Sequence, residues 1–140
     1  MPLSRVLFVS DLHLAGERPD TTGRFRRFVE TVVPGASTLY ILGDLFEAWP
    51  GDDALSLPFE SEIAALLPAA SSHAPLFFMH GNRDFVLGET FARATGATLL
   101  ADPSTIDLHG RRAVLLHGDT LCTDDREYQA FRAQVRSPAW

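Results

Sequence analysis

Three short, continuous apolar segments constrain the fold of this chain more than any other feature of its sequence. They cover residues 5–10, 38–42 and 75–80, and none of them alternates apolar with polar positions. Such runs are typical of strands buried on both faces, as in parallel sheets. Helices predicted over residues 22–33 and 59–67 separate the three runs, the second of them ended by Pro68. This order of elements predicts βαβ units and therefore an α/β fold.

The second half of the chain predicts shorter elements. Gly96 suits the end of one helix, because glycine readily adopts the left-handed conformation found there. Asp124 suits the start of another, because a negative charge favours the N-terminal end of the helix dipole. The expected elements are a helix over residues 85–94, strands over 104–108 and 112–116, and a helix over 124–135.

Composition excludes several function classes. The 18 acidic and 12 basic residues give a net charge of −6, which argues against a protein that coats nucleic acid. All basic residues are Arg, so Schiff-base chemistry and a P-loop lysine are excluded. Cys122 is the only cysteine, which excludes an intrachain disulfide and favours a reducing, cytosolic setting. No apolar run is as long as a transmembrane helix, so we expect any membrane contact to be peripheral. We also expect no obligate protein partner.

Polar groups able to bind a metal ion follow the ends of four predicted strands. Because ligands of open α/β sheets bind at the carboxyl ends of the strands, these groups should meet in one crevice. Their mixture of oxygen and nitrogen donors suits Mn²⁺, Fe or Zn²⁺ better than Ca²⁺. Asp44 could bridge two cations, since each of its oxygens can face one ion. The groups are Asp11 and His13 after the first strand, Asp44 after the second, Asn82 after the third and His117 after residues 112–116.

Each of these motifs also has an interpretation without metal. Gly-Asp after a strand is commonly only a turn, and Asn82 could serve as a left-handed turn residue. Asp11 and His13 can face the same ion only if the chain bends after Ser10. Their conjunction at four strand ends favours the metal site. The remaining histidines, His73, His80 and His109, are interpreted as structural or surface groups, and Asp52-Asp53 could be only a solvated loop pair.

Taken in order, the motifs resemble the signature of calcineurin-like binuclear metallophosphoesterases. Longer stretches over residues 9–14, 43–53 and 116–125 resemble the UDP-2,3-diacylglucosamine pyrophosphohydrolase family of lipid A biosynthesis, as does Arg83, where most of the superfamily has His. The resemblance implies an α-β-β-α sandwich with central mixed sheets flanked by helices. The motifs are Asp11-x-His13, Gly43-Asp44, Gly81-Asn82-x-Asp84 and His117-Gly118.

The same resemblance implies a reaction. Two Mn²⁺ ions would share Asp44 and support hydrolysis of UDP-2,3-diacylglucosamine to UMP and 2,3-diacylglucosamine 1-phosphate, on the cytoplasmic face of the bacterial inner membrane. Arg83, which is always charged, would offset charge on the phosphate in the transition state. The implied metal ligands are Asp11, His13, Asp44, Asn82 and His117; Asp44 and Arg83 are assigned to catalysis, and Asn82, Arg83 and Asp125 to the substrate.

Part of the family pattern has no counterpart in the chain. A later Gly-His-x-His motif and the helices that hold acyl chains are absent from the 140 residues. We therefore expect residues 1–140 to form the N-terminal part of a metallophosphoesterase domain, incomplete at its C-terminus, with impaired activity. Two alternatives stay open. One is another binuclear metallophosphoesterase, such as a phosphodiesterase, nucleotidase or nuclease, since these share their metal ligands. The other is a catalytically inactive binding scaffold.

Overall fold

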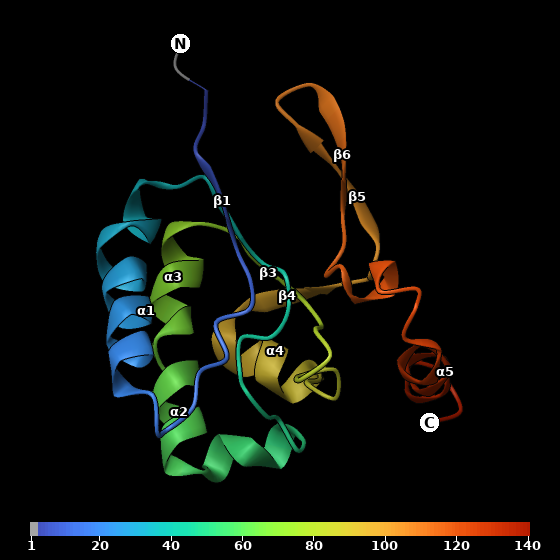
Figure 1. Cartoon of the computed structure of the whole chain (residues 1–140). Helices are drawn as coiled ribbons and strands as arrows, with labels where there is room; N and C mark the ends of the chain where they lie inside the picture. Colours follow the sequence, from blue (N-terminus) through green and yellow to red (C-terminus); the bar gives the residue numbers. More distant parts are fainter. Residues whose placement is uncertain (1–2) are drawn as a thin grey trace.

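The computed structural model describes residues 3–140 and contains a four-stranded sheet with helices packed on one face (Figure 1). All neighbouring strands are parallel, and their order in the sheet follows their order in the chain. The three predicted strands and the βαβ connections are therefore confirmed. The strands are β1 (Val6–Val9), β2 (Thr38–Ile41), β3 (Leu76–Met79) and β4 (Ala97–Leu100).

Prolines start the helices of this layer rather than ending them. Pro19 and Pro58 open their helices, and Pro68 is the second residue of its own. The prediction that Pro68 ends a helix is wrong, because a proline in the first turn removes only an N–H that would have no helical partner. The helices are α1 (Pro19–Thr31), α2 (Pro58–Ala64), α3 (Leu67–His73) and α4 (Glu89–Thr95), with 3₁₀ turns at Val33–Gly35 and Asp52–Ser56.

Two local features differ from the sequence prediction. Helix α4 begins at Glu89 and not near residue 85, because the side chain of Asp52 accepts hydrogen bonds from the backbone N–H groups of Gly88 and Phe91 and caps the helix there. The alternative that Asp52 is only a solvated loop residue is therefore excluded. Gly96 ends α4 in the left-handed conformation, as predicted, and the chain then enters β4, a short strand that the sequence did not indicate.

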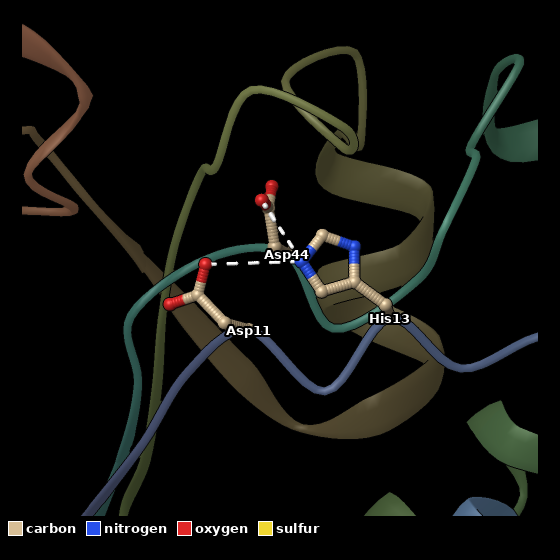
Figure 2. Close-up of side chains that lie close together, drawn as sticks. All are labelled: Asp11, His13 and Asp44. Carbon is tan, nitrogen blue, oxygen red and sulfur yellow. Dashed lines mark ion pairs between the residues drawn. The ribbon is translucent and has the colours of Figure 1, made fainter. Parts of the chain in front are cut away.

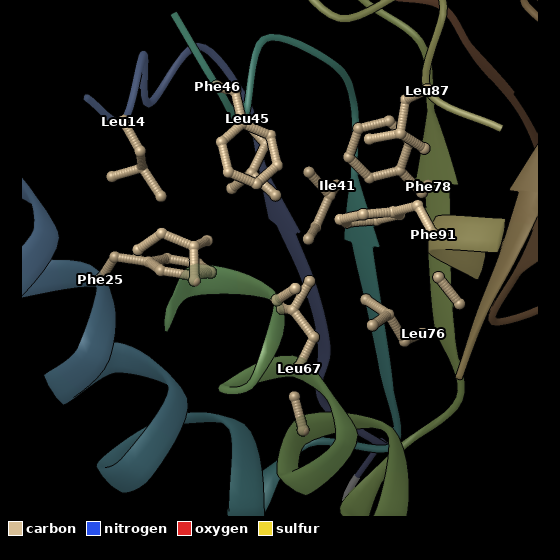
Figure 3. Close-up of a cluster of buried hydrophobic side chains, with 14 of the residues drawn as sticks. Leu14, Phe25, Ile41, Leu45, Phe46, Leu67, Leu76, Phe78, Leu87 and Phe91 are labelled. Carbon is tan, nitrogen blue, oxygen red and sulfur yellow. The ribbon is translucent and has the colours of Figure 1, made fainter. Parts of the chain in front are cut away.

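The hydrophobic core lies between the sheet and the helices. Figure 3 shows Phe25 of α1, Leu67 of α3 and Phe91 of α4 against Ile41 and Phe78 of the strands. Each of these side chains is at most 3% exposed. Burial of one such side chain stabilises a fold by about 1.5–3 kcal/mol, so this layer holds the strand ends in place.

The opposite face of the sheet carries a row of aromatic rings. Phe8, Tyr40 and Phe77 occupy one register line, and their ring centroids are 5.1 and 5.0 Å apart. Phe8 is 39% exposed. The expectation that the strands are buried on both faces is therefore wrong for the described residues, because only the helical face is fully covered. The rings stack on one another across the strands instead.

A hairpin and a final helix lie on the other side of the sheet from α1 and α3 (Figure 1). The hairpin is antiparallel and pairs with no strand of the parallel sheet, so parallel and antiparallel strands are separate in residues 3–140 and do not form the expected mixed sheet. Within the same residues, no helix combines the length and the apolar character needed to cross a bilayer. The hairpin strands are β5 (Ser104–Leu108) and β6 (Arg111–Leu115), and the final helix is α5 (Arg126–Val135), all close to the predicted ranges. A 3₁₀ turn at Asp119–Leu121, which was not predicted, lies between β6 and α5.

Candidate metal centre

Three of the predicted ligands meet beyond the carboxyl ends of β1 and β2. Figure 2 shows the carboxylates of Asp11 and Asp44 pointing toward the same nitrogen of His13. This Nε2 lies 3.8 Å from Oδ1 of Asp11 and 3.6 Å from Oδ2 of Asp44. One potential ligand atom from each residue lies within 4.8 Å of the other two. The arrangement offers two oxygen donors and one nitrogen donor to a single ion.

The backbone is bent at each of these three residues. Asp11, His13 and Asp44 have φ angles of 56°, 49° and 53°. These angles fall in the left-handed region, which residues other than glycine rarely adopt. Backbone hydrogen bonds from Asp11 to Gly43 and from His13 to Asp44 hold the bends. The bend after Ser10 that Asp11 and His13 need in order to face one ion is therefore present. Strained backbone of this kind, at about 1–3 kcal/mol per residue, is characteristic of functional sites.

A second group forms around His117. Its Nε2 lies 3.1 Å from Oδ1 of Asn82 and 3.5 Å from Oδ2 of Asp44. Oδ2 of Asp44 thus lies within 3.6 Å of Nε2 of both histidines. Its other oxygen, Oδ1, accepts a hydrogen bond from the backbone N–H of Arg83 at 2.9 Å. We expected the two oxygens to face different ions; one oxygen lies between the two groups instead.

The charges of this cluster are strongly coupled. Hydrogen bonding to Asp44 raises the pKa of His117 to about 9, although burial acts in the opposite direction. Burial would raise the pKa of Asp44, but His117, the N–H of Arg83 and His13 together lower it. At neutral pH an ionised Asp44 is therefore paired with a charged His117. A divalent cation would take over the role of that proton.

A buried carboxylate beneath the cluster joins the two loops that carry it. Asp84 is fully buried and accepts hydrogen bonds from the backbone N–H groups of Gly81, Asp44 and Leu45. Burial raises the pKa of Asp84, and these N–H groups act against that effect. Asp84 thereby fixes the loop after β2 to the loop after β3.

Sequence comparison places this arrangement in a known family. The sequence profile described as calcineurin-like phosphoesterase matches residues 4–136. The chain belongs to the calcineurin-like phosphoesterase family. Members of this family use a pair of divalent metal ions, and the mixed oxygen and nitrogen donors on the bent loops fit that use.

Curated relatives refine the comparison within the calcineurin-like phosphoesterases. A UDP-2,3-diacylglucosamine hydrolase of Xanthomonas axonopodis pv. citri is 55% identical over 134 residues, which are 96% of this chain and 54% of the relative. A protein of the same name from Stenotrophomonas maltophilia is 54% identical over the same share of each chain. The chain thus spans about half the length of these relatives.

Solved structures support the fold. Yfce, a phosphoesterase from E. coli, superposes with a TM-score of 0.52 at 25% identity, over 82% of this chain and 58% of that chain. The nuclease MPE of Pseudomonas putida superposes with a TM-score of 0.56 at 18% identity, over 74% of this chain and 51% of the nuclease. At this identity the likeness shows the fold alone. The predicted calcineurin-like α/β fold class is confirmed.

Two of the three predicted substrate residues, Asn82 and Asp125, line the same cavity. A cavity of about 430 Å³ extends from Asp11, Asn82 and His117 to Asp125. Asp125 also caps α5 by accepting a hydrogen bond from the backbone N–H of Tyr128 at 3.0 Å. The guanidinium of Arg83 is half-exposed and lies outside the residues that line this cavity.

Sequence reasoning missed the polar groups that support these loops. Asp119 is bound by the hydroxyl of Tyr128 and by Nε of Arg132, so it anchors α5 beside His117. Glu47 contacts His13 and lies close to Arg83. The position of Glu47 within residues 43–53, one of the stretches that carry the resemblance, was the available signal for its role. His80 bonds the carbonyl of Leu87, in agreement with its interpretation as structural.

Proposed function

We propose that this chain carries the metal-binding and phosphate-binding part of a UDP-2,3-diacylglucosamine pyrophosphohydrolase. The reaction would cleave the pyrophosphate bond to give UMP and 2,3-diacylglucosamine 1-phosphate. One observation carries the proposal: Oδ2 of Asp44 lies within 3.6 Å of Nε2 of both His13 and His117, in a chain 55% identical to a relative with the hydrolase name.

Two groups of residues would hold the metal pair. Asp11 and His13 would serve one ion, Asn82 and His117 the other, and Asp44 both. Mn²⁺ is the proposed metal because the family resemblance implies it; the mixed carboxylate, amide and imidazole donors suit Mn²⁺, as they also suit Fe and Zn²⁺. When bound, such a pair activates water and stabilises charge on phosphoryl oxygens.

The rest of the chemistry falls to side chains around the pair. Arg83 is a permanent cation with a forked set of donors, so it would bind phosphate oxygens as negative charge builds up on them. The backbone N–H of Arg83 holds Oδ1 of Asp44, so this residue would fix the carboxylate while its side chain meets the substrate. Asp125, which lines the cavity, would accept hydrogen bonds from the glucosamine head group.

The substrate class also suggests where the protein works. UDP-2,3-diacylglucosamine carries two acyl chains that would stay in a bilayer while the head group enters the cavity. We therefore place the protein on the cytoplasmic face of the inner membrane as a peripheral protein. Co-sedimentation with vesicles that contain the substrate tests this placement.

The reaction is tested by offering two substrates to the Mn²⁺-loaded chain. The expected result is slow UMP release from UDP-2,3-diacylglucosamine, well below that of the full-length relative, that disappears in Asp44→Ala. Hydrolysis of bis(p-nitrophenyl) phosphate without UMP release would favour another metallophosphoesterase. Bound metal with turnover of neither substrate would favour an inactive binding scaffold. The relative from Stenotrophomonas maltophilia serves as the positive control for the assay.

A further inference from the structure

The two ring nitrogens of His13 have different partners. Nδ1 lies 2.9 Å from Oε2 of Glu47, which is hydrogen-bond distance, whereas Nε2 is 3.6 Å or more from the carboxylates of Asp44 and Asp11. An ionised carboxylate can only accept, so Nδ1 must carry the proton of this bond. In the neutral ring, the lone pair of Nε2 then faces the two carboxylates. This is the tautomer in which Nε2 can bind a metal ion.

Glu47 is held in place by the core. Its backbone N–H donates to the carbonyl of Leu14 at 3.0 Å, and Leu14 donates in turn to Leu45 at 2.8 Å. Leu14 and Phe46 form an isolated parallel bridge and are each 1% exposed. The loops after β1 and β2 are thereby joined beyond the ends of their strands. The carboxylate of Glu47 meets His13 because buried neighbours fix its backbone.

His117 has the same arrangement with a different acceptor. Its Nδ1 lies 2.7 Å from the carbonyl oxygen of Leu42, and its Nε2 faces Asp44 and Asn82. Each histidine therefore uses Nδ1 for orientation and turns Nε2 toward the shared carboxylate. At His117 a neutral carbonyl is sufficient as the acceptor. At His13 the acceptor is a charged side chain, which can hold further partners.

The other oxygen of Glu47 faces the predicted phosphate-binding arginine. Oε1 lies 3.7 Å from Nη1 of Arg83, while Nη1 of Arg18 lies 3.4 Å from Oε2. Glu47 is 30% exposed and Arg83 is 53% exposed, so this ion pair is partly screened by water. Its effect is to restrict where the long side chain of Arg83 can lie.

We infer that Glu47 is a positioning residue that orients a metal ligand and a phosphate-binding group at the same time. It holds His13 with Nε2 toward Asp11 and Asp44, and it holds the guanidinium of Arg83 on the same side of the site. The Arg83 part rests on the proposed function. The His13 part needs only the metal site.

The His13 part is tested with Glu47→Gln and Glu47→Ala in the metal-free and Mn²⁺-titrated chain. Two-bond ¹H–¹⁵N spectra report which ring nitrogen carries the proton, and calorimetry reports Mn²⁺ affinity. We expect the wild-type ring to be protonated at Nδ1 and the variants to lose this preference. Mn²⁺ affinity should fall by about 10–100-fold, as is typical when the partner of a ligating histidine is removed.

Matched controls separate positioning from a general loss of charge or of folding. Glu62→Gln makes the same charge change at an exposed pair with Arg26 and should leave both measurements unchanged. If Glu47→Ala unfolds, Glu47→Gln, which keeps the length of the side chain, decides the result. An unchanged tautomer and unchanged Mn²⁺ affinity in the folded variant would overturn the His13 part.

The Arg83 part is tested by a double-mutant cycle on pyrophosphate binding to the Mn²⁺-loaded chain. If Glu47 acts through Arg83, the effect of Glu47→Gln in the Arg83→Ala background should differ from its effect in the wild type. Purely additive effects would overturn this part. A chain that binds pyrophosphate but releases no UMP would contradict the proposed function and still allow the cycle to decide on Glu47.

Discussion

Gly81 lies directly against the side chain of Asp44. A Cβ placed on Gly81 would be 2.1 Å from Oδ1 of the carboxylate and 2.4 Å from the backbone nitrogen of Asp44. Gly43 approaches from the other side, where a Cβ would be 2.6 Å from backbone atoms of Gly81. Gly43 of the loop after β2 therefore packs directly against Gly81 of the loop after β3. This contact lets Asp44 lie between His13 and His117.

Replacing Gly81 should disturb the site more than the fold. In Gly81→Ala the new methyl group must displace the carboxylate of Asp44, because both neighbouring atoms lie inside contact distance. We expect Mn²⁺ affinity to fall at least tenfold, measured by calorimetry. Gly23→Ala is the matched control: a Cβ there meets no atom within 4 Å, and alanine in a helix should stabilise the protein by about 0.5–1 kcal/mol. Equal metal affinity in the two variants would contradict the close-contact argument.

Asp44→Ala should remove metal from both halves of the site. Oδ2 of Asp44 lies within 3.6 Å of Nε2 of both His13 and His117, so its removal takes an oxygen donor from both positions. Elemental analysis after dialysis against Mn²⁺ should find less than one ion per chain. Retention of two ions would rule out a shared carboxylate. Asp53→Ala, at an exposed carboxylate, provides the control for loss of charge.

Arg83→Ala should separate metal binding from turnover. Only the backbone N–H of Arg83 contacts Asp44, and that group remains in the variant. We expect metal content to be unchanged and UMP release to fall by about 10²–10³-fold, the usual effect of losing one pre-organised donor to a developing charge. The measurement is steady-state turnover beside elemental analysis. Normal turnover would exclude Arg83 from the reaction.

The sequence allowed most of the parallel sheet to be predicted, because continuous apolar runs and their spacing are local signals. The places of Asp11, Asp44 and Asn82 followed from the rule that parallel strands end at one edge. The bend that brings His13 back toward Asp11 could only be stated as a condition. Its cause is a set of hydrogen bonds to the loop after β2, which lies about thirty residues further along the chain.

What could not be predicted depends on contacts between distant residues. Glu47 and Asp84 lie in stretches that carry the family resemblance, but no local pattern indicates their contacts, because these are made with backbone groups or side chains from other loops. The start of α4 was misplaced for the same reason, since its capping residue, Asp52, comes from 37 positions before Glu89. Local propensity contains no signal for such partners.

The cap supplied by Asp52 should make stability depend on pH. Its carboxylate accepts hydrogen bonds from the backbone N–H groups of Gly88 and Phe91, both at 2.9 Å, and from the indole of Trp49 at 3.1 Å. Burial would raise the pKa of Asp52, but these donors lower it below the usual value. The ionised cap therefore stabilises the fold above the pKa of the unfolded chain, about 3.9, and this contribution is lost as the pH falls through the lower pKa of the folded state.

Asp52→Asn tests this linkage against Asp53→Asn, the same change at the exposed neighbouring position. Loss of the charged cap should cost about 0.5–2 kcal/mol of unfolding free energy at pH 7, measured by urea denaturation. At pH 3 the difference between wild type and Asp52→Asn should be smaller, because protonation weakens the wild-type cap there. Asp53→Asn should have the same unfolding free energy as the wild type at both pH values, because the side chain of Asp53 is exposed to solvent. A difference for Asp52→Asn that stays constant from pH 7 to pH 3 would show that the charge of Asp52 does not support the start of α4.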